Sequence, residues 1–136
     1  MINSSAIDSN IILYVLDSDE ASLKKQVALE IISTVPFFSS QSLSEVINVC
    51  HKRWKYDKVK LIGVANFLLI NCTLVPITSQ TVELTHHLLH KYHFQYFDSL
   101  IVAAALENDC KTLYSEDMQH ELLVENSLSI LNPFLA

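Results

Sequence analysis

Short apolar runs alternate with longer amphipathic segments along the chain, and this pattern predicts strands that alternate with helices. In residues 20–34, for example, apolar positions recur at the three- to four-residue spacing of a helix that faces a core. Capping residues stand before several helical segments, and Pro36 ends one of them. We therefore expect strands at 4–8, 37–39, 73–76, 111–114 and 128–131, helices at 9–17, 20–34, 42–55, 58–70, 79–91 and 98–109, and a short helical turn after Asp117.

Strands joined by helices predict a parallel sheet, and right-handed crossovers place helices on both of its faces. The expected fold class is a three-layer α/β/α arrangement around four or five short strands. The length of 136 residues favours a single domain over residues 1–136, and a hydrophobic content of 50% is sufficient for a core. The single glycine excludes glycine-rich phosphate-binding loops, which need several.

Cysteine usage and hydropathy indicate a cytoplasmic protein. The three cysteines, Cys50, Cys72 and Cys110, are isolated in apolar surroundings, so we expect buried free thiols in a reducing compartment. The most apolar stretch, residues 61–75, is too short to span a membrane, and residues 1–10 lack the features of a signal peptide.

Four acidic residues fall where helices should begin. Asp8 follows the first predicted strand, Glu45 the second, and Asp117 the fourth, while Asp98 opens the helix that leads into the fourth strand. All four therefore belong to the carboxyl edge of a parallel sheet, where α/β proteins bind ligands. Converging carboxylates repel one another unless a cation neutralises them, and Mg²⁺ or Mn²⁺ prefers oxygen ligands. The set predicts a metal site suited to phosphodiester hydrolysis.

Helix capping is the alternative explanation for each acid taken alone. Asp8, Asp98 and Asp117 each suit an N-cap or a first helical turn, where the helix dipole favours negative charge. Glu45 would complete a capping box with Ser42. Capping and metal binding do not exclude each other, and four acids at one edge favour the metal site.

Four segments carry a resemblance to a known family: AIDSNIILYVLD (6–17), SLSEVINV (42–49), YFDSLIVAAALENDC (96–110) and LYSEDMQH (113–120). In their order and spacing the chain resembles PIN-domain ribonucleases, most of all the VapC-type toxins of bacterial toxin–antitoxin pairs. The resemblance implies a PIN-like fold and a magnesium-dependent (or manganese-dependent) endoribonuclease that cleaves RNA phosphodiester bonds. It also implies a cognate antitoxin protein that blocks the site, and a homodimer.

The resemblance assigns a role to each acid. Asp8 and Asp98 would bind the metal directly, Glu45 would bind it or activate water, and Asp117 would complete the acidic pocket. The residues expected to position water or phosphate are Ser9, Asn10 and Ser115.

The last acid needs a choice, because Glu116 and Asp117 are adjacent. The family's Ser/Thr-x-Asp stretch matches Ser115 and Asp117, so we choose Asp117. Many relatives carry a further acid two residues later, where this chain has Gln119. That departure puts a complete second metal site in question.

Basic residues are concentrated in one segment of an otherwise acidic chain, whose net charge is −6. Lys52, Arg53 and Lys55 are interleaved with Trp54 and Tyr56, a composition that can hold an RNA backbone and stack on bases. The alternative is a solvated helix end whose cations complement the helix dipole. The sequence leaves both open.

A histidine cluster, His86, His87, His90 and His93, lacks the glutamate of an HExxH zinc motif and is interpreted as a partly exposed helix. Two other functions remain as alternatives to the nuclease. One is a PIN-like RNA- or protein-binding module without catalysis. The other is a receiver-like signalling domain, which would need an acid after strand 73–76 where the chain has Pro76-Ile77-Thr78.

Overall fold

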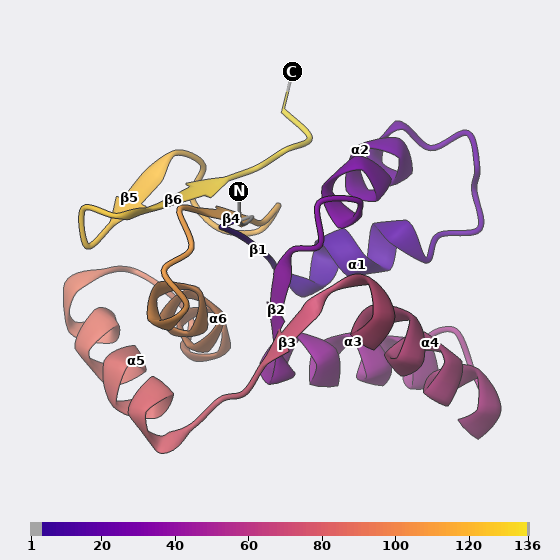
Figure 1. Ribbon diagram of the computed structural model, residues 1–136, viewed down its shortest axis with the longest axis horizontal. Coiled ribbons are helices and arrows are strands. Elements are labelled where there is room, and N and C mark those ends of the chain that lie inside the picture. The colour runs from indigo at the N-terminus through magenta and orange to yellow at the C-terminus, as the bar shows by residue number, and fades with distance from the viewer. Residues whose placement is uncertain (1–3, 136) are drawn as a thin grey trace.

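The computed structural model describes residues 4–135 and has the expected α/β/α architecture (Figure 1). The helices begin and end close to the predicted positions. The elements, in chain order, are β1 (Ser5–Ile7), α1 (Ser9–Val15), α2 (Leu23–Ile32), β2 (Phe37–Ser39), α3 (Ser40–Lys52), α4 (Lys58–Asn71), β3 (Thr73–Val75), α5 (Ser79–Lys91), α6 (Tyr96–Glu107), β4 (Thr112–Tyr114), β5 (Leu122–Val124) and β6 (Leu128–Leu131).

The sheet has the strand order β3-β2-β1-β4-β6-β5, and all its pairs are parallel except β5 with β6. The described residues therefore contain six strands rather than four or five. The predicted strand at 128–131 is confirmed as β6. The additional strand is β5, which forms a hairpin with β6.

Successive side chains of a strand point to opposite faces of the sheet. The short strands therefore contribute to two hydrophobic cores, one on each face. Ile7 and Phe38 pack with α1, α2, α3 and α4 on one face of the sheet. Ala6, Phe37 and Leu113 pack with α5 and α6 on the other. Figure 1 shows the two helical groups on either side of the sheet. Burial on both faces explains why the strands are almost continuously apolar.

The start of α3 differs from the predicted capping box. The helix begins at Ser40 directly after β2, and the N-cap is Ser39, whose side chain accepts a hydrogen bond from the backbone N–H of Ser42. Ser42 is thus inside the first turn and fully buried. The box prediction was wrong because strand and helix are joined without a loop. Glu45 is consequently free of any capping role.

The local structure predicted around two further acids differs from the structure. Asp98 does not open α6 but lies in its first turn, after the N-cap Gln95. Asp117 starts no helix, because residues 115–121 form bends and a turn that lead into β5. The helical turn predicted after Asp117 is therefore wrong.

The β5–β6 hairpin turns through two residues with positive φ, Glu125 (50°) and Asn126 (57°), as in a type I′ turn. Such turns usually contain glycine, which this segment lacks. The Glu125 carboxylate is held instead by the side chains of Lys91, Tyr92 and His87 at distances of 2.6, 2.9 and 3.1 Å. These bonds, that from Lys91 foremost, lower the pKa of Glu125 to about 2. Contacts with α5 thus stabilise a turn that its own sequence does not favour.

The cysteine prediction holds for the thiols themselves: Cys50, Cys72 and Cys110 are buried and free. Burial raises the pKa of both Cys72 and Cys110 to about 11, so neither is an activated nucleophile. Within residues 4–135, the structure contains no helix of the length and apolar character needed to cross a membrane.

Candidate metal and nuclease site

The site lies at the point where the sheet reverses its strand order. The chain adds β2 and β3 outward on one side of β1 and then returns to place β4 on the other side. Asp8 and Ser115 immediately follow β1 and β4, and the backbone N–H of Asp8 donates to the carbonyl of Tyr114 at 3.0 Å. The two strand ends are thereby fixed side by side, in the crevice where open α/β sheets bind ligands.

Asp8 is the most deeply buried acid of the site, with 3% of its surface exposed. Its carboxylate caps α1 by accepting from the backbone N–H of Ser9 at 2.7 Å, and it also accepts from the Ser115 hydroxyl at 2.8 Å. Burial raises the pKa of Asp8 to about 6. The two hydrogen bonds lower the pKa but do not offset the effect of burial, and the nearby negative charges of Asp98 and Glu45 raise it further.

Glu45 reaches the site from the second turn of α3. Its Oε1 accepts a hydrogen bond from the Ser9 hydroxyl at 2.9 Å, and its Oε2 accepts from the Gln41 amide at 3.3 Å. The same serine therefore links Glu45 to the cap of α1. Ser9 donates its backbone N–H to Asp8 and its hydroxyl to Glu45, and these two hydrogen bonds fix the two carboxylates relative to each other.

Asp98 completes the electrostatic cluster from the first turn of α6. Partial burial raises its pKa, and the charges of Glu45 and Asp117 raise it further. Asp98 thus interacts with all three of the other acids, since it also raises the pKa of Asp8. The structure therefore brings together the four acids that the sequence selected.

The adjacent acids Asp117 and Glu116 form hydrogen bonds with different residues. Asp117 accepts from the Asn10 amide at 3.1 Å, and its backbone N–H donates to the Ser115 hydroxyl at 3.2 Å. Glu116 instead accepts from the Tyr14 hydroxyl at 2.7 Å and pairs with Lys24. Burial opposes ionisation of Glu116, but the bonds from Lys24 and Tyr14 outweigh it and lower its pKa.

We predict that Glu116→Gln and Asp117→Asn have unequal effects on RNA cleavage. Asp117→Asn should lower activity about 10- to 100-fold, the range for groups that support a metal site. Glu116→Gln should stay within a few-fold of wild type, because its carboxylate is already neutralised by Lys24 outside the acid cluster. Cleavage rates at equal Mg²⁺ check this. Equal losses in the two variants would reject the distinction.

The four acids have no cationic partner among residues 4–135, where the five ion pairs of the structure involve only other carboxylates. Nor does any group of three or more His, Cys, Asp or Glu side chains in this part of the chain already enclose a point where a metal ion would lie. The carboxylates therefore interact electrostatically without being closed on one centre. An all-oxygen donor set with uncompensated charge fits Mg²⁺ or Mn²⁺.

The three polar residues expected to assist the acids all contact them. Ser9, Asn10 and Ser115 each donate a side-chain hydrogen bond to one of the four carboxylates. Sequence reasoning missed Gln41, although it lies one helical turn before Glu45 and its amide is available at the i, i+4 spacing.

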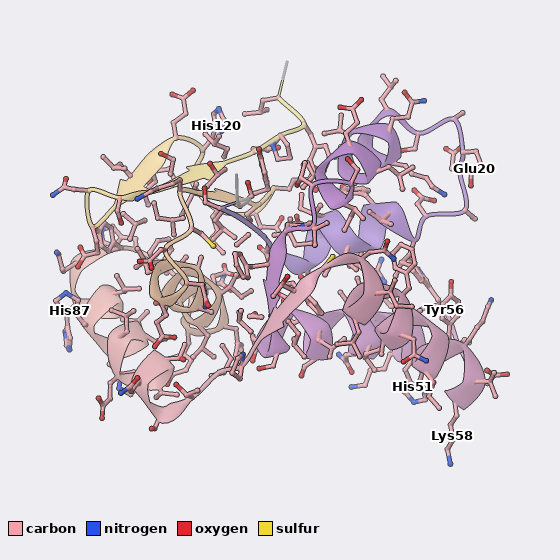
Figure 2. All side chains as sticks on the ribbon, in the orientation of Figure 1. Glu20, His51, Tyr56, Lys58, His87 and His120 are labelled. Atoms are coloured by element: carbon pink, nitrogen blue, oxygen red, sulfur yellow. The ribbon has the colours of Figure 1, made fainter. Side chains whose placement is uncertain are left out.

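The basic segment lies away from the acids. Lys52 ends α3 seven residues after Glu45, which corresponds to about 10 Å along a helix. In Figure 2, the neighbouring His51 and Lys58 lie at the outer end of the α3–α4 pair, on the opposite side of the molecule from His87. Lys52, Arg53 and Lys55 are exposed. Contact with RNA at these residues stays a prediction.

The histidines serve other contacts. His86 is hydrogen-bonded to the Tyr96 hydroxyl at 2.7 Å, and His87 lies 3.1 Å from Glu125. His90 and His93 are exposed. Within residues 4–135, these side chains belong to no group of three or more possible metal ligands.

A cavity of about 310 Å³ adjoins the acids. Asp98 and Asp117 form part of its wall. The remainder comes from residues 91–95, which end α5 and connect it to α6, and from the residues that follow Asp117 on the way to β5. The cavity was not anticipated, because it depends on the unpredicted β5 segment. The acid site therefore opens into a defined concave space.

This fold and site define an α/β protein with an acidic pocket at the switch point of a mostly parallel sheet. The chain belongs to the PIN domain family, whose model matches residues 6–123. No curated protein sequence matches the chain.

Solved structures with the same fold include proteins of toxin–antitoxin systems. A toxin–antitoxin complex from Klebsiella pneumoniae matches with a TM-score of 0.71 at 15% identity, over 96% of this chain and 98% of that one. VapC20 of Mycobacterium tuberculosis, described as a sarcin-ricin loop cleaving toxin, matches with a TM-score of 0.67 at 14% identity, over 83% and 89%. VapBC2 of Rickettsia felis bound to promoter DNA matches with a TM-score of 0.66 at 15% identity, over 94% and 98%. At these identities the likeness establishes the fold.

Proposed function

We propose that the protein is a magnesium-dependent (or manganese-dependent) endoribonuclease and the toxin of a toxin–antitoxin pair. The observation that carries the proposal is the cluster of Asp8, Glu45, Asp98 and Asp117 at the sheet switch point, without a cationic side chain among residues 4–135 to neutralise it. Membership of the PIN domain family supports the nuclease assignment.

The chain's own residues prepare this site for a divalent cation. Asp8 and Asp98 are the proposed direct ligands, with Glu45 and Asp117 completing the acidic pocket. Ser9 and Ser115 hold the Asp8 carboxylate by two hydrogen bonds, and Asn10 holds Asp117, so the oxygens are oriented before any ligand arrives. A bound Mg²⁺ or Mn²⁺ would polarise the phosphodiester and lower the pKa of a water that attacks it. Glu45, which accepts a hydrogen bond from the Ser9 hydroxyl, is the proposed acceptor of the proton that this water releases.

The proposed partners follow from relatives rather than from this chain alone. One structural relative is described as a toxin–antitoxin complex, and two as complexes with DNA. We propose that a cognate antitoxin covers the acidic pocket of this protein in the cytoplasm, and that the toxin is a homodimer.

The direct test is cleavage of a short unstructured RNA by the purified protein with Mg²⁺, with EDTA, and with Mg²⁺ restored. We expect cleavage only with the metal, no cleavage of the equivalent DNA, and products without 2′,3′-cyclic phosphate, because water rather than the ribose hydroxyl attacks. Cleavage that persists in EDTA would contradict the mechanism. RNA binding without cleavage would instead identify a non-catalytic PIN-like module.

The basic segment gives a separate prediction about RNA affinity. Changing Lys52, Arg53 and Lys55 together to Glu should weaken RNA binding and reduce the dependence of log K on log salt by about 0.7 for each phosphate that the protein no longer neutralises. Lys111→Glu is the matched control, since Lys111 is exposed just before β4, at the opposite edge of the sheet from the acids. Binding is measured over a salt series, and an unchanged slope in the triple variant would reject an RNA-binding role.

A further inference from the structure

We propose that a second cavity, remote from the acids, binds a guanine base of RNA. It lies between the α1–α2 loop and the α3–α4 connection, and Figure 2 shows Glu20 and Tyr56 of these two segments on the side of the molecule opposite His87. Its volume of about 360 Å³ is in the range of small-ligand pockets, and its lining residues are Leu16, Asp17, Ser18, Trp54 and Tyr56. The inference rests on the proposed nuclease function and adds a contact with the substrate away from the cleaved bond.

Two helices connect this cavity to the acids. Asp8 is the N-cap of α1, and Leu16, the C-cap of the same helix, lines the cavity. Glu45 lies in the second turn of α3, and Trp54 follows the end of that helix. The eight residues from Asp8 to Leu16 correspond to about 12 Å along a helix. At about 3.4 Å per stacked nucleotide of one strand, the bound base is about three or four nucleotides from the cleaved bond.

Trp54 supplies the stacking surface for the base. Its side chain remains 37% exposed at the cavity, and its ring centre lies 5.7 Å from that of Tyr56 at an angle of 51°. The Lys60 ammonium group lies 4.2 Å from the centre of the Tyr56 ring, so one face of that ring is already covered. Bases of every kind stack on an aromatic ring. The Trp54 ring therefore provides affinity for a base but does not choose among the four.

Asp17 supplies the choice of base. An ionised carboxylate only accepts hydrogen bonds, and its two oxygens can accept from two neighbouring donors. Guanine alone presents two neighbouring donors, N1–H and N2–H₂, on its Watson–Crick edge, where proteins read unpaired bases. The five ion pairs among residues 4–135 do not include Asp17, so its carboxylate charge has no cationic partner there. The carboxylate thus selects guanine.

Both walls of the cavity are held in place by hydrogen bonds within the protein. The Asp17 carboxylate accepts from the backbone N–H of Asp19 at 3.0 Å, and the Asp17 carbonyl accepts from the buried Lys25 ammonium group. On the other wall, the backbone N–H of Tyr56 donates to the carbonyl of Cys50 at 3.0 Å. The ring and the carboxylate are therefore positioned before a base arrives, which lowers the entropic cost of binding.

Cations beside the cavity are suited to the phosphates of an RNA strand. Lys52, Arg53 and Lys55 are exposed, and none of them forms an ion pair with residues 4–135. Because the three cations are spread over four positions of the sequence, they can contact more than one phosphate of a strand. An aromatic ring, a carboxylate and several cations at one cavity fit a guanine nucleotide within RNA better than an inorganic anion.

Tryptophan fluorescence tests the site directly, because Trp54 is the only tryptophan of the chain. The wild-type protein is titrated in EDTA with GMP, IMP, AMP and UMP, and N-acetyltryptophanamide corrects for light absorbed by the nucleotide. We expect saturable quenching by GMP, and binding of AMP and UMP weaker by about 10-fold or more. IMP should also bind more weakly than GMP, because it lacks the 2-amino group. Equal affinity for all four, or no saturable quenching, would overturn the guanine site.

Asp17→Asn tests the carboxylate, and Asp19→Asn is its matched control. Both substitutions remove one negative charge from the same loop, but Asp19 does not line the cavity. An asparagine at position 17 still offers an oxygen to the backbone N–H of Asp19, so the melting temperature should stay near wild type. We expect Asp17→Asn to lose the preference for GMP over AMP and Asp19→Asn to keep it. A preference that survives in Asp17→Asn, or is lost equally in both, would overturn the assigned contact.

A short oligonucleotide distinguishes RNA from a free nucleotide as the source of the base. The probe is a uridine heptanucleotide with one central guanosine, titrated in EDTA against the same fluorescence signal. We expect it to bind at least about 10-fold more tightly than GMP, with an advantage that decreases as salt rises, because its phosphates contact the basic residues. Equal affinity of GMP and the oligonucleotide would keep the guanine site but overturn its assignment to RNA.

Fluorescence in EDTA needs no cleavage, so failure of this site and failure of the nuclease are separable. With Mg²⁺, a single guanosine moved through a cleavable RNA should raise kcat/KM by about 10-fold at one position, about three or four nucleotides from the cleaved bond, in the wild type but not in Asp17→Asn. A flat series would overturn the contribution of this site to cleavage. Guanine-dependent quenching without any cleavage would reject only the nuclease.

Discussion

Asp98→Asn is expected to lower the rate of RNA cleavage by about 10²- to 10³-fold, the decrease typical of removing one group that stabilises developing charge. Asp98 interacts electrostatically with all three other acids, so its charge is central to the set that would hold the cation. The substitution keeps the shape of the side chain and relieves repulsion within the cluster. The fold should therefore remain intact, and the melting temperature without metal should not fall.

Asp109→Asn is the matched control for Asp98→Asn. Asp109 is exposed just after the opposite end of α6 and has a φ of 56°, a conformation that asparagine also adopts readily. Rates of cleavage at saturating Mg²⁺ and thermal unfolding in EDTA check both variants. Wild-type cleavage by Asp98→Asn, or an equal decrease in Asp109→Asn, would remove the basis of the proposed mechanism.

Asp8→Asn is expected to stabilise the metal-free protein at neutral pH by up to about 3 kcal/mol, because the pKa of Asp8 is raised from 3.8 to about 6 by burial. Below pH 3.8 the carboxyl is protonated in both the folded and the unfolded state, and its contribution to stability is fully present. Between pH 3.8 and 6 the unfolded chain loses this proton first, so stability falls as pH rises. Above pH 6 the decrease in stability is complete.

Denaturant unfolding in EDTA across this pH range measures the effect. The wild-type protein should become less stable toward neutral pH, and Asp8→Asn should change less, because its amide does not titrate and still caps α1. Mg²⁺ should stabilise the wild type at neutral pH and leave the variant nearly unchanged. A variant that is less stable than wild type at neutral pH without metal would contradict the account of a destabilising, metal-free carboxylate.

The sequence predicts the parts of the fold that follow from hydrophobic periodicity and fails where tertiary contacts override local preference. Strand Phe37–Ser39 and helix Ser79–Lys91 follow their patterns. β5 was missed because its turn at Glu125 and Asn126 lacks glycine and depends on Lys91 and Tyr92, which come from the end of α5. No local pattern contains that information.

The site was predictable to the extent that the order of strands and helices along the chain determines which residues lie at the carboxyl edge of the sheet. Asp8, Glu45, Asp98 and Asp117 could be placed together because strand ends and helix starts share that edge. Their local roles could not all be predicted: Glu45 has no capping partner in Ser42 once α3 begins at Ser40. The cavity was beyond sequence reasoning, because residues 91–95 meet the 117–122 segment only in the folded protein.

The most direct test of the central claim, that the four carboxylates form a divalent-cation site, is calorimetric titration of Mg²⁺ into the wild-type protein and into Asp98→Asn at neutral pH, with Asp109→Asn as control. We predict saturable binding to the wild type and to Asp109→Asn, with affinity reduced by about 10-fold or more in Asp98→Asn. Equal Mg²⁺ affinity in all three proteins, or no binding to the wild type, would contradict it.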